Sequence, residues 1–335
     1  MKIALCSYYN PHFVNTTVYR YKAIEALGHQ PVMVPDRPYA LPGRLRRRWP
    51  ALQAWDLRRI NQQFLRISQK ERPDLWITVG GDTMLPATVQ AIRELGIPTA
   101  LWTTNVPLDF KIVCEAAIHY DHVFCAGTEA MDFLCAHGVK TTHWLPYGCD
   151  PAYHHPVTLT DEEYQRYHRS VAFVGSHYPN REALLKTISD LDIGIWGPYW
   201  DRLDTHSPLK KKARPGKINF NVWTKIYSAA DITVVVHYQD GHTPSYQASP
   251  KLFEAMACRA FVLCDRQKDA VTLFHHEGCV DFFDSPEELR DKIRHYTRHP
   301  ALRQDMAKKA QALVTGKHTF KQRMARLIDT ALGRN

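Results

Sequence analysis

Short apolar runs alternate with amphipathic stretches along the first 145 residues of the chain. The pattern predicts a strand over residues 2–6, a helix over 16–27 that ends at Gly28, and a second strand over 32–34. The same alternation predicts further strands over 75–79, 99–102, 122–125 and 141–145, with helices over 85–95 and 129–137. Strands that are apolar on both faces and separated by helices are typical of βαβ units, which build a parallel sheet.

The pattern stops after Tyr147 and resumes at Val171. The intervening stretch contains Pro151 and Pro156 and has no apolar periodicity, so we expect a linker over 151–170. Beyond it, the pattern predicts strands over 171–174, 193–196, 232–236, 261–264 and 280–283, and helices over 181–191, 223–230, 251–257, 286–299, 301–314 and 320–332. We therefore predict an α/β fold with two doubly wound parallel sheets, one in a domain over 1–150 and the other in a domain over 171–317. Ligands of such sheets bind at the carboxyl ends of the strands.

Composition narrows the class of protein. The 335 residues are 44% hydrophobic and 23% charged, which excludes a lone small module and extensive disorder. The net charge of +9 suits an anionic ligand without requiring one. The eight cysteines include no CxxC pair, which argues against a zinc cluster or a disulfide framework and favours reduced thiols in a cytoplasmic protein. No apolar run approaches the roughly 18 residues that span a bilayer, so we expect at most peripheral membrane contact.

The most informative segment begins a predicted helix at Ser249. Ser249 can cap this helix and Pro250 suits its first turn, so free backbone N–H groups should point from the helix start toward an anion such as phosphate. Lys251 adds a positive charge in the same turn, and Glu254 lies one turn further along the same face. A diphosphate on the N–H groups would leave Glu254 placed to accept hydrogen bonds from sugar hydroxyls. An ordinary capping arrangement explains the same residues equally well.

Two further strand ends carry candidate binding residues. Gly175 permits close backbone approach after the strand at 171–174, Ser176 offers a hydroxyl, and Arg181 offers a bidentate donor for a phosphate. Gly197 follows the strand at 193–196, within a segment of glycine, proline and aromatic residues that could stack on a base. A plain strand-to-helix turn and ordinary aromatic packing are the alternative interpretations.

A histidine follows the strand at 232–236. His237, Asp240 and His242 are close together in the sequence, and a metal site can be considered for them. Because they fall in a predicted loop, we favour a polar lining of the donor site, with His237 as one of its binding residues, and expect no metal.

Polar residues at strand ends of the first domain could accept a proton. His12 follows the first strand, Asp82 follows a pair of glycines after the third, and Asp109 follows the strand at 99–102. A histidine or a carboxylate in such a place can act as the base that takes the proton of an acceptor hydroxyl. A turn or capping role is the alternative for each of the three.

Two basic runs, Arg44–Arg48 and Lys210–Arg214, could meet an anionic membrane or a phosphorylated acceptor. Solvated loops are the simpler interpretation of both runs. Neither run is interleaved with exposed stacking aromatics and no known nucleic-acid-binding module is present, so we expect no nucleic-acid partner.

Six motifs follow one another through the second half of the chain. They are FVGS at 173–176, an Asn-Arg helix start at 180–181, IWGPYW at 195–200, VVVHY at 234–238, SPKLFEAMACRAFVLCD at 249–265 and HTFKQR at 318–323. Their order resembles that of the CgeB-like glycosyltransferases, a spore-maturation-related branch of the GT-B superfamily. The resemblance covers roughly residues 171–332, and the first half matches more loosely through GGD at 80–82 and LPYGCD at 145–150.

The resemblance implies two Rossmann-like domains that face a cleft, and a last helix, within 318–335, that crosses back to the first domain. It also implies that a nucleotide diphosphate sugar is held mainly by the second domain. Carried over to this sequence, Glu254 holds the donor ribose, while Lys251 and the helix start at Ser249 and Pro250 bind the diphosphate. The first glycine-rich turn is formed by Gly175, Ser176 and Arg181.

Two positions depart from the related pattern. Related GT-B families often have a second glutamate eight residues before the ribose-binding one, where this chain has Tyr246, so a carboxylate contact to the transferred sugar is absent. The pattern also usually has glycine after the alanine and cysteine at the helix end, where this chain has Arg259. Arginine suits the helix dipole but gives up the easy left-handed turn of glycine, which puts the local turn geometry in doubt.

These observations predict a glycosyltransferase that moves a sugar from a nucleotide diphosphate sugar to an unknown glycan, protein or small-molecule acceptor, with retention and without a metal or other cofactor. A nucleoside diphosphate is a good leaving group, so positive charge and helix-end N–H groups at the phosphates should carry much of the catalysis. A nucleotide-sugar epimerase and a non-catalytic nucleotide-sugar sensor are the alternatives, and Tyr246 disfavours the epimerase. The base, the sugar and the acceptor are not determined by the sequence.

Overall fold

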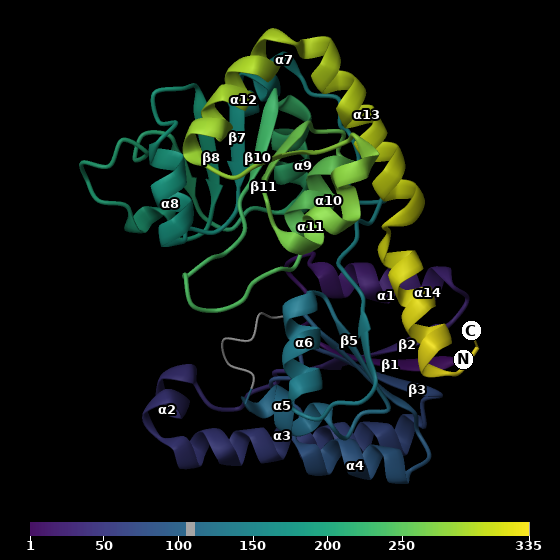
Figure 1. Ribbon diagram of the computed structural model, residues 1–335. Helices are drawn as coiled ribbons and strands as arrows, with labels where there is room; N and C mark the ends of the chain where they lie inside the picture. Colours follow the sequence, from purple (N-terminus) through teal and green to yellow (C-terminus); the bar gives the residue numbers. More distant parts are fainter. Residues whose placement is uncertain (105–110, 335) are drawn as a thin grey trace. The chain divides into compact units, whose positions relative to one another are not determined.

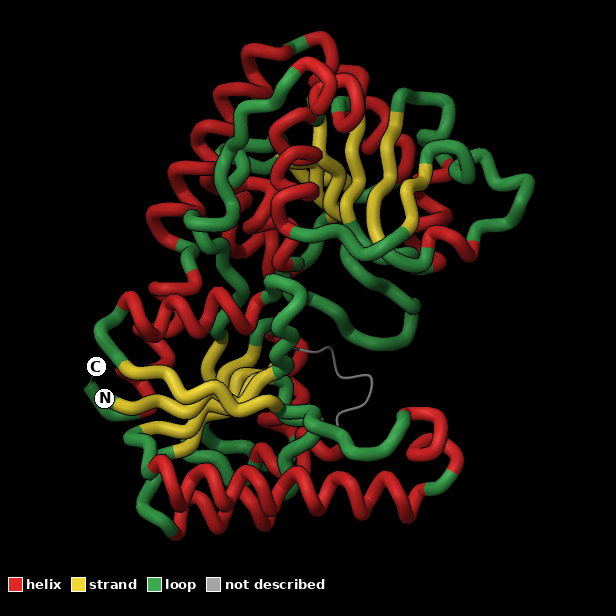
Figure 2. Tube along the Cα trace, turned by 180° about the vertical axis from the view of Figure 1, so that it is seen from behind, coloured by secondary structure: helices red, strands yellow, loops and turns green. Residues whose placement is uncertain are grey.

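The computed structural model describes residues 1–104 and 111–334 and divides the chain into two compact units. Unit 1 comprises residues 1–146 together with 320–335, and unit 2 comprises residues 147–319. Each unit contains one six-stranded parallel sheet with helices packed around it (Figures 1 and 2). The predicted α/β class, with two doubly wound parallel sheets, is therefore confirmed.

The sheet of unit 1 has the strand order β2-β1-β3-β4-β5-β6. Its strands are β1 (Lys2–Ser7), β2 (Gln30–Pro35), β3 (Leu75–Val79), β4 (Thr99–Thr103), β5 (His122–Cys125) and β6 (Thr142–Trp144). The helices of this unit are α1 (Thr16–Ala26), α2 (Gly43–Arg48), α3 (Pro50–Glu71), α4 (Pro86–Glu94), α5 (Lys111–Ala117), α6 (Thr128–Ala136) and α14 (Phe320–Ala331). The strand order reverses between β1 and β3, so the loops after these two neighbouring strands flank the crevice where such sheets bind ligands.

The sheet of unit 2 has the strand order β12-β11-β10-β7-β8-β9. Its strands are β7 (Val171–Val174), β8 (Ile193–Gly197), β9 (Ala213–Pro215), β10 (Ile232–Val235), β11 (Val262–Asp265) and β12 (Asp281–Phe283). The helices are α7 (Asp161–Tyr167), α8 (Pro179–Lys186), α9 (Phe220–Ala229), α10 (Pro250–Ala257), α11 (Lys268–Phe274), α12 (Pro286–Arg298) and α13 (Pro300–Lys317). Here the order reverses between β7 and β10, which places the loops after these strands at the switch point.

The last helix, α14, belongs to unit 1 although it lies at the far end of the chain. It packs on α1, with the Phe320 ring 5.5 Å from that of Tyr19 and 6.3 Å from that of Trp102. The Arg20 guanidinium lies 4.4 Å from the centre of the Trp102 ring, so a buried cation stacks beside these aromatic rings. The return of the last helix to the first domain is confirmed.

Six α-helices and strands of the structure were not predicted from the sequence: α2, α3, α5, α7, α11 and β9. The 22-residue helix α3 was not predicted, although Leu57, Ile60 and Phe64 are buried at helical spacing along one face. The basic run at Arg44–Arg48 is the helix α2 and not a solvated loop. The end of the second basic run belongs to β9, and α7 lies inside the predicted linker, where Thr160 caps it with a complete capping box.

No helix in the described part of the chain is both long enough and apolar enough to cross a membrane. All eight cysteines are free thiols in this structure, and six of them are buried in the two units.

Candidate functional site

The N-terminus of α10 lies in unit 2, and its local structure follows the predicted cap. The Ser249 side chain accepts a hydrogen bond from the Lys251 backbone N–H at 3.3 Å, and Pro250 occupies the first turn. The Leu252 N–H donates to the Ser249 carbonyl at 3.0 Å. The first amides of the helix are therefore bonded inside the protein, which corrects the expectation that they are free. An incoming phosphate would have to exchange places with the Ser249 hydroxyl.

Lys251 and Glu254 form an ion pair one turn inside α10. The Lys251 Nζ lies 2.7 Å from a Glu254 carboxylate oxygen, and the side chains are 29% and 5% exposed. The ammonium also lies 4.3 Å from the centre of the Trp223 ring, which adds a cation–π contact. Burying a carboxylate is costly unless a cation is beside it, and Lys251 is that cation for Glu254. The structure therefore brings the predicted pair together, and the Glu254 side chain is more deeply buried than the Lys251 side chain.

The side chains around Glu254 were not identified from the sequence. Trp223 and Tyr227 stand at i and i+4 on α9 and are both buried. The Tyr227 hydroxyl has no hydrogen-bond partner among the described residues, and burial, followed by the negative charge of Glu254, raises the pKa of Tyr227 well above its usual value. His154 is fully buried, and burial lowers its pKa to about 4. The aromatic residues at i and i+4 on α9 were the one sequence signal that could have identified the side chains around Glu254.

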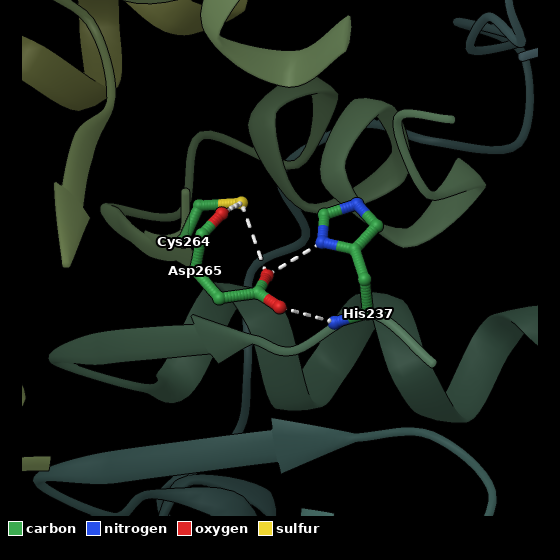
Figure 3. Close-up of side chains that lie close together, drawn as sticks. All are labelled: His237, Cys264 and Asp265. Atoms are coloured by element: carbon green, nitrogen blue, oxygen red, sulfur yellow. Dashed lines mark hydrogen bonds and ion pairs between the residues drawn. The ribbon is translucent and has the colours of Figure 1, made fainter. Parts of the chain in front are cut away.

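His237 joins two strand ends to the start of α10. Figure 3 shows its contact with Asp265. Its Nδ1 lies 2.5 Å from one carboxylate oxygen of Asp265, and its backbone N–H donates to the other oxygen at 2.9 Å. Its Nε2 accepts the Ser249 backbone N–H at 2.8 Å. Because Nε2 accepts a proton donor, the proton of the neutral ring resides on Nδ1 and points at Asp265. His237 is therefore a positioning residue for α10, since both ring nitrogens are already bonded within the protein.

Hydrogen bonds connect the turn after β7 to the end of β10. Arg181 donates from Nε to the Val236 carbonyl and from one Nη to the Ser176 carbonyl, each at 2.9 Å. Asn180 donates to the His237 carbonyl at 2.8 Å. Burial lowers the pKa of the Arg181 guanidinium below its usual value. Two of the five N–H groups of Arg181 therefore hold the turn, so a phosphate would meet only the remaining ones.

Gly175 and Gly197 lie against each other where β7 and β8 end. A Cβ atom on Gly197 would lie 2.1 Å from the Gly175 carbonyl oxygen, and Gly197 has a φ of +145°. The Gly175 carbonyl also accepts the Trp200 indole N–H at 2.8 Å. This close backbone approach explains Gly197, whereas a Cβ atom on Gly175 would lie 3.0 Å from the Phe173 ring. Trp200 lies in the core with 1% exposure.

The three residues considered as metal ligands do not come together. Asp240 accepts the backbone N–H groups of His242 and Thr243, which lowers the pKa of its carboxyl far below the usual value and forms a local turn. Among the described residues, the group with metal-ligand spacing is His237, Cys264 and Asp265. The hydrogen bonds of His237 to Asp265 and Ser249 account for this grouping without a metal.

Two of the three candidate bases lie in unit 1, at the strand ends of its switch point. His12 is exposed in a turn after β1, where its N–H donates to the Asn10 side chain at 2.9 Å. Asp82 follows β3 and receives the Arg37 guanidinium at 3.0 Å. Arg37 also bonds the buried Asp36, and burial raises the pKa of that carboxyl. Asp109 lies outside the described residues.

Residues 180–329 match the family model described as "Glycosyl transferase-like". The spore protein CgeB of Bacillus subtilis is 22% identical over 253 residues, covering 70% of this chain and 76% of CgeB. The family resemblance drawn from the motif order is therefore confirmed.

Solved structures share the fold at low sequence identity. Sucrose-phosphate synthase of Thermosynechococcus elongatus superposes with a TM-score of 0.69 at 14% identity, and both chains are fully covered. Anabaena HepE in complex with UDP-glucose gives a TM-score of 0.68 at 10% identity, covering 99% of this chain and all of HepE. A protein assigned as UDP-N-acetylglucosamine 2-epimerase from Listeria monocytogenes gives 0.63 at 11% identity, covering all of this chain and 97% of the epimerase.

The fold is that of the GT-B class, with one parallel six-stranded sheet in each unit and a C-terminal helix on α1. Residues 180–329 match the glycosyl transferase-like family model, and the chain is similar to the spore protein CgeB.

Proposed function

We propose that the protein is a glycosyltransferase that moves a sugar from a nucleoside diphosphate sugar, with a uridine nucleotide as the first donor to test, to an acceptor hydroxyl. The acceptor is a glycan, a protein or a small molecule, and the sugar keeps its anomeric configuration. We place the reaction in the cytoplasm, where free thiols such as the eight in this chain persist. The UDP-glucose held by the structurally similar HepE supports the choice of uridine.

The observation that carries this proposal is the buried Glu254 carboxylate beside Lys251 at the start of α10. Glu254 can accept hydrogen bonds from two ribose hydroxyls, and Lys251 can hold the adjoining diphosphate. The positive end of the helix dipole favours the same anion. The carboxyl end of β10 and the turn after β7 lie at the switch point of this sheet, where ligands of the fold bind.

We expect these residues to stabilise the charge that develops during transfer. In transfer, the bond from the anomeric carbon to the diphosphate oxygen breaks while the acceptor oxygen bonds to that carbon. The departing diphosphate gains negative charge, which Lys251 and the helix end stabilise. The acceptor proton passes to a base, for which His12, Asp82 and Asp109 are the candidates.

An epimerase of the same fold is the second candidate function, because one of the structurally similar proteins bears that assignment. Tyr246 supplies a phenol where related GT-B families have a carboxylate near the transferred sugar, which favours transfer over epimerisation. Incubation with UDP-sugars separates the two, since a transferase or its slow hydrolysis releases UDP whereas an epimerase converts one UDP-sugar into another.

Binding of UDP and of inorganic pyrophosphate, measured by titration calorimetry, tests the site. We expect Lys251→Met to weaken both ligands about 10- to 100-fold, because a charged hydrogen bond contributes roughly 1.5–3 kcal/mol. Glu254→Gln should weaken UDP by a similar factor but leave pyrophosphate binding unchanged or stronger. The amide keeps one acceptor oxygen but loses the second acceptor and the charge that strengthen the bonds to the ribose hydroxyls, and it frees the Lys251 ammonium.

Lys268→Met is the matched control. Lys268 also begins a helix of unit 2 and also lies over an aromatic ring, 4.9 Å from the centre of Tyr246. The control should bind both ligands like the parent. Equal weakening of UDP and pyrophosphate by Glu254→Gln would contradict the ribose assignment, and parental binding by Lys251→Met would move the diphosphate elsewhere.

A further inference from the structure

Residues 43–59 of unit 1, which we call the arginine–tryptophan arm, combine exposed cations with exposed large apolar side chains. The arm consists of α2 and the first turns of α3, and it projects past the end of the sheet of its unit (Figures 1 and 2). Arg44, Arg47 and Arg48 are exposed on α2. Trp49 and Trp55 are 55% and 48% exposed. Single exposed apolar residues are common, but two tryptophans within seven residues beside three arginines form a defined surface.

The arm is held in place by one buried carboxylate. Asp56 accepts the backbone N–H groups of Ala40 and Leu41 at 3.0–3.1 Å, and Arg59 at 2.9 Å. Arg46, the half-buried arginine of the run, bonds the Leu41 carbonyl. Asp56 is fully buried and is the only acidic residue between 43 and 59, so no exposed negative charge offsets the cations of the arm.

We propose that the arginine–tryptophan arm docks the protein on an anionic lipid surface. Arginine side chains near such a surface are attracted to its headgroups, and tryptophan prefers the boundary between headgroups and hydrocarbon. Leu45, which is 44% exposed on α2, adds apolar surface next to the cations. Segments that lie in a membrane interface typically combine basic residues with exposed tryptophan and leucine, as this arm does.

A nucleic acid is the rival occupant, and the structure brings it back into consideration. A nucleic acid is not expected from the sequence, because neither basic run is interleaved with exposed aromatic residues, but the structure shows Trp49 and Trp55 exposed next to the first run. Leu45 favours the lipid, because an aliphatic side chain gains from hydrocarbon contact but has no aromatic face on which to stack a base.

Flotation with vesicles measures the docking on the full chain. We expect the protein to float with vesicles of phosphatidylcholine and phosphatidylglycerol in a 7:3 ratio at about 0.1 M salt, and to remain behind with phosphatidylcholine alone. Raising the salt to about 0.5 M should weaken the binding, because screening shortens the reach of the charges. The double variant Arg47→Gln with Arg48→Gln should bind about 25-fold more weakly, since each arginine contributes about fivefold.

The double variant Lys217→Gln with Lys308→Gln is matched in charge and should float like the parent, because both lysines are exposed in unit 2, outside the arm and outside the basic run at 210–214. Trp49→Ser with Trp55→Ser should weaken the binding without changing its salt dependence. Equal flotation of the arm variants and the parent would overturn the proposal. So would tight binding of a 20-nucleotide single strand that depends on the arm while vesicles are not bound.

Discussion

The Asp265–His237–Ser249 chain is expected to be the most sensitive polar element of unit 2. Asp265 accepts two hydrogen bonds from His237, one from the ring at 2.5 Å and one from the backbone N–H at 2.9 Å. In Asp265→Asn only one side-chain oxygen can accept, and the new NH₂ group must face the other donor. Turning the His237 proton to Nε2 would only move the conflict to the Ser249 N–H, which already donates there at 2.8 Å.

The magnitude follows from the burial of these groups. An unsatisfied buried donor costs about 1–3 kcal/mol, and the lost charged hydrogen bond adds to it, so we expect Asp265→Asn to lower the free energy of unfolding by about 3 kcal/mol. Urea unfolding followed by circular dichroism measures the loss. Calorimetry with UDP should show weaker binding as well, because the start of α10 is no longer fixed.

Asp284→Asn is the control for this substitution. Asp284 follows the neighbouring strand β12, is 59% exposed and pairs with Arg266 at 2.8 Å. An exposed ion pair contributes about 0–1 kcal/mol, so this variant should remain near the parent. Equal losses of stability in the two variants would refute the assignment of a rigid, fully bonded chain at Asp265.

Two further substitutions in unit 2 test the local energetics. Because burial lowers the pKa of His154 to about 4, whereas an unfolded histidine has about 6.5, the unfolded state binds the extra proton as the pH falls through that window. The parent should therefore lose about 3 kcal/mol of stability between pH 6.5 and 4 that His154→Gln does not lose. Urea unfolding at pH 7, 5.5 and 4.5 measures the difference. Parallel losses of stability in the two proteins would contradict the buried neutral state of His154. At the end of α10, Arg259 has a φ of +60°, and its N–H and that of Ala260 bond back to Met256 and Ala255. Arg259→Gly should be more stable than Arg259→Ala by about 1 kcal/mol in thermal unfolding, because both remove the charge and only glycine relieves the left-handed strain; equal stability would show that the turn has relaxed.

The elements best predicted from the sequence are those with local signals. The strands at the centre of both sheets are continuous apolar runs, and Ser249 followed by Pro250 marks the start of α10 because a cap and a first-turn proline act within four residues. The Arg259 turn shows the limit of local reasoning. The absent glycine raised doubt about its geometry, yet the left-handed turn forms, because the hydrogen bonds to Ala255 and Met256 and the buried strand after it fix the backbone.

The elements that were missed depend on tertiary contacts. The apolar residues of α3 are spread among many polar ones, so its helical pattern is weak in the sequence. The arginine run before it suggested a loop, because the sequence does not show that Asp56 accepts the N–H groups of Ala40 and Leu41. The partnership of His237 with Asp265 depends on the pairing of β10 with β11, which brings together residues 28 positions apart in the sequence. No spacing rule within a single segment could supply that contact.

The start of α10 is the proposed donor site, and a ligand that binds there would have to exchange hydrogen-bond partners with the protein. Ser249 N–H is bonded to His237, the Lys251 N–H to the Ser249 hydroxyl, and the Lys251 ammonium to Glu254. The exchange is inexpensive at the cap, where the hydrogen bond is 3.3 Å long, and a diphosphate can replace the hydroxyl with little loss.

At the ion pair the exchange is selective. A bare phosphate would draw the ammonium from the buried Glu254 and leave that carboxylate without its cation, which is costly at 5% exposure. A ligand that carries hydroxyls beside its phosphates supplies Glu254 with new donors at the moment when Lys251 turns to the anion. In the proposed site, the buried acid would therefore disfavour inorganic phosphates relative to nucleotides. For this reason we expect Glu254→Gln to separate the binding of UDP from that of pyrophosphate, and Lys251→Met not to separate them.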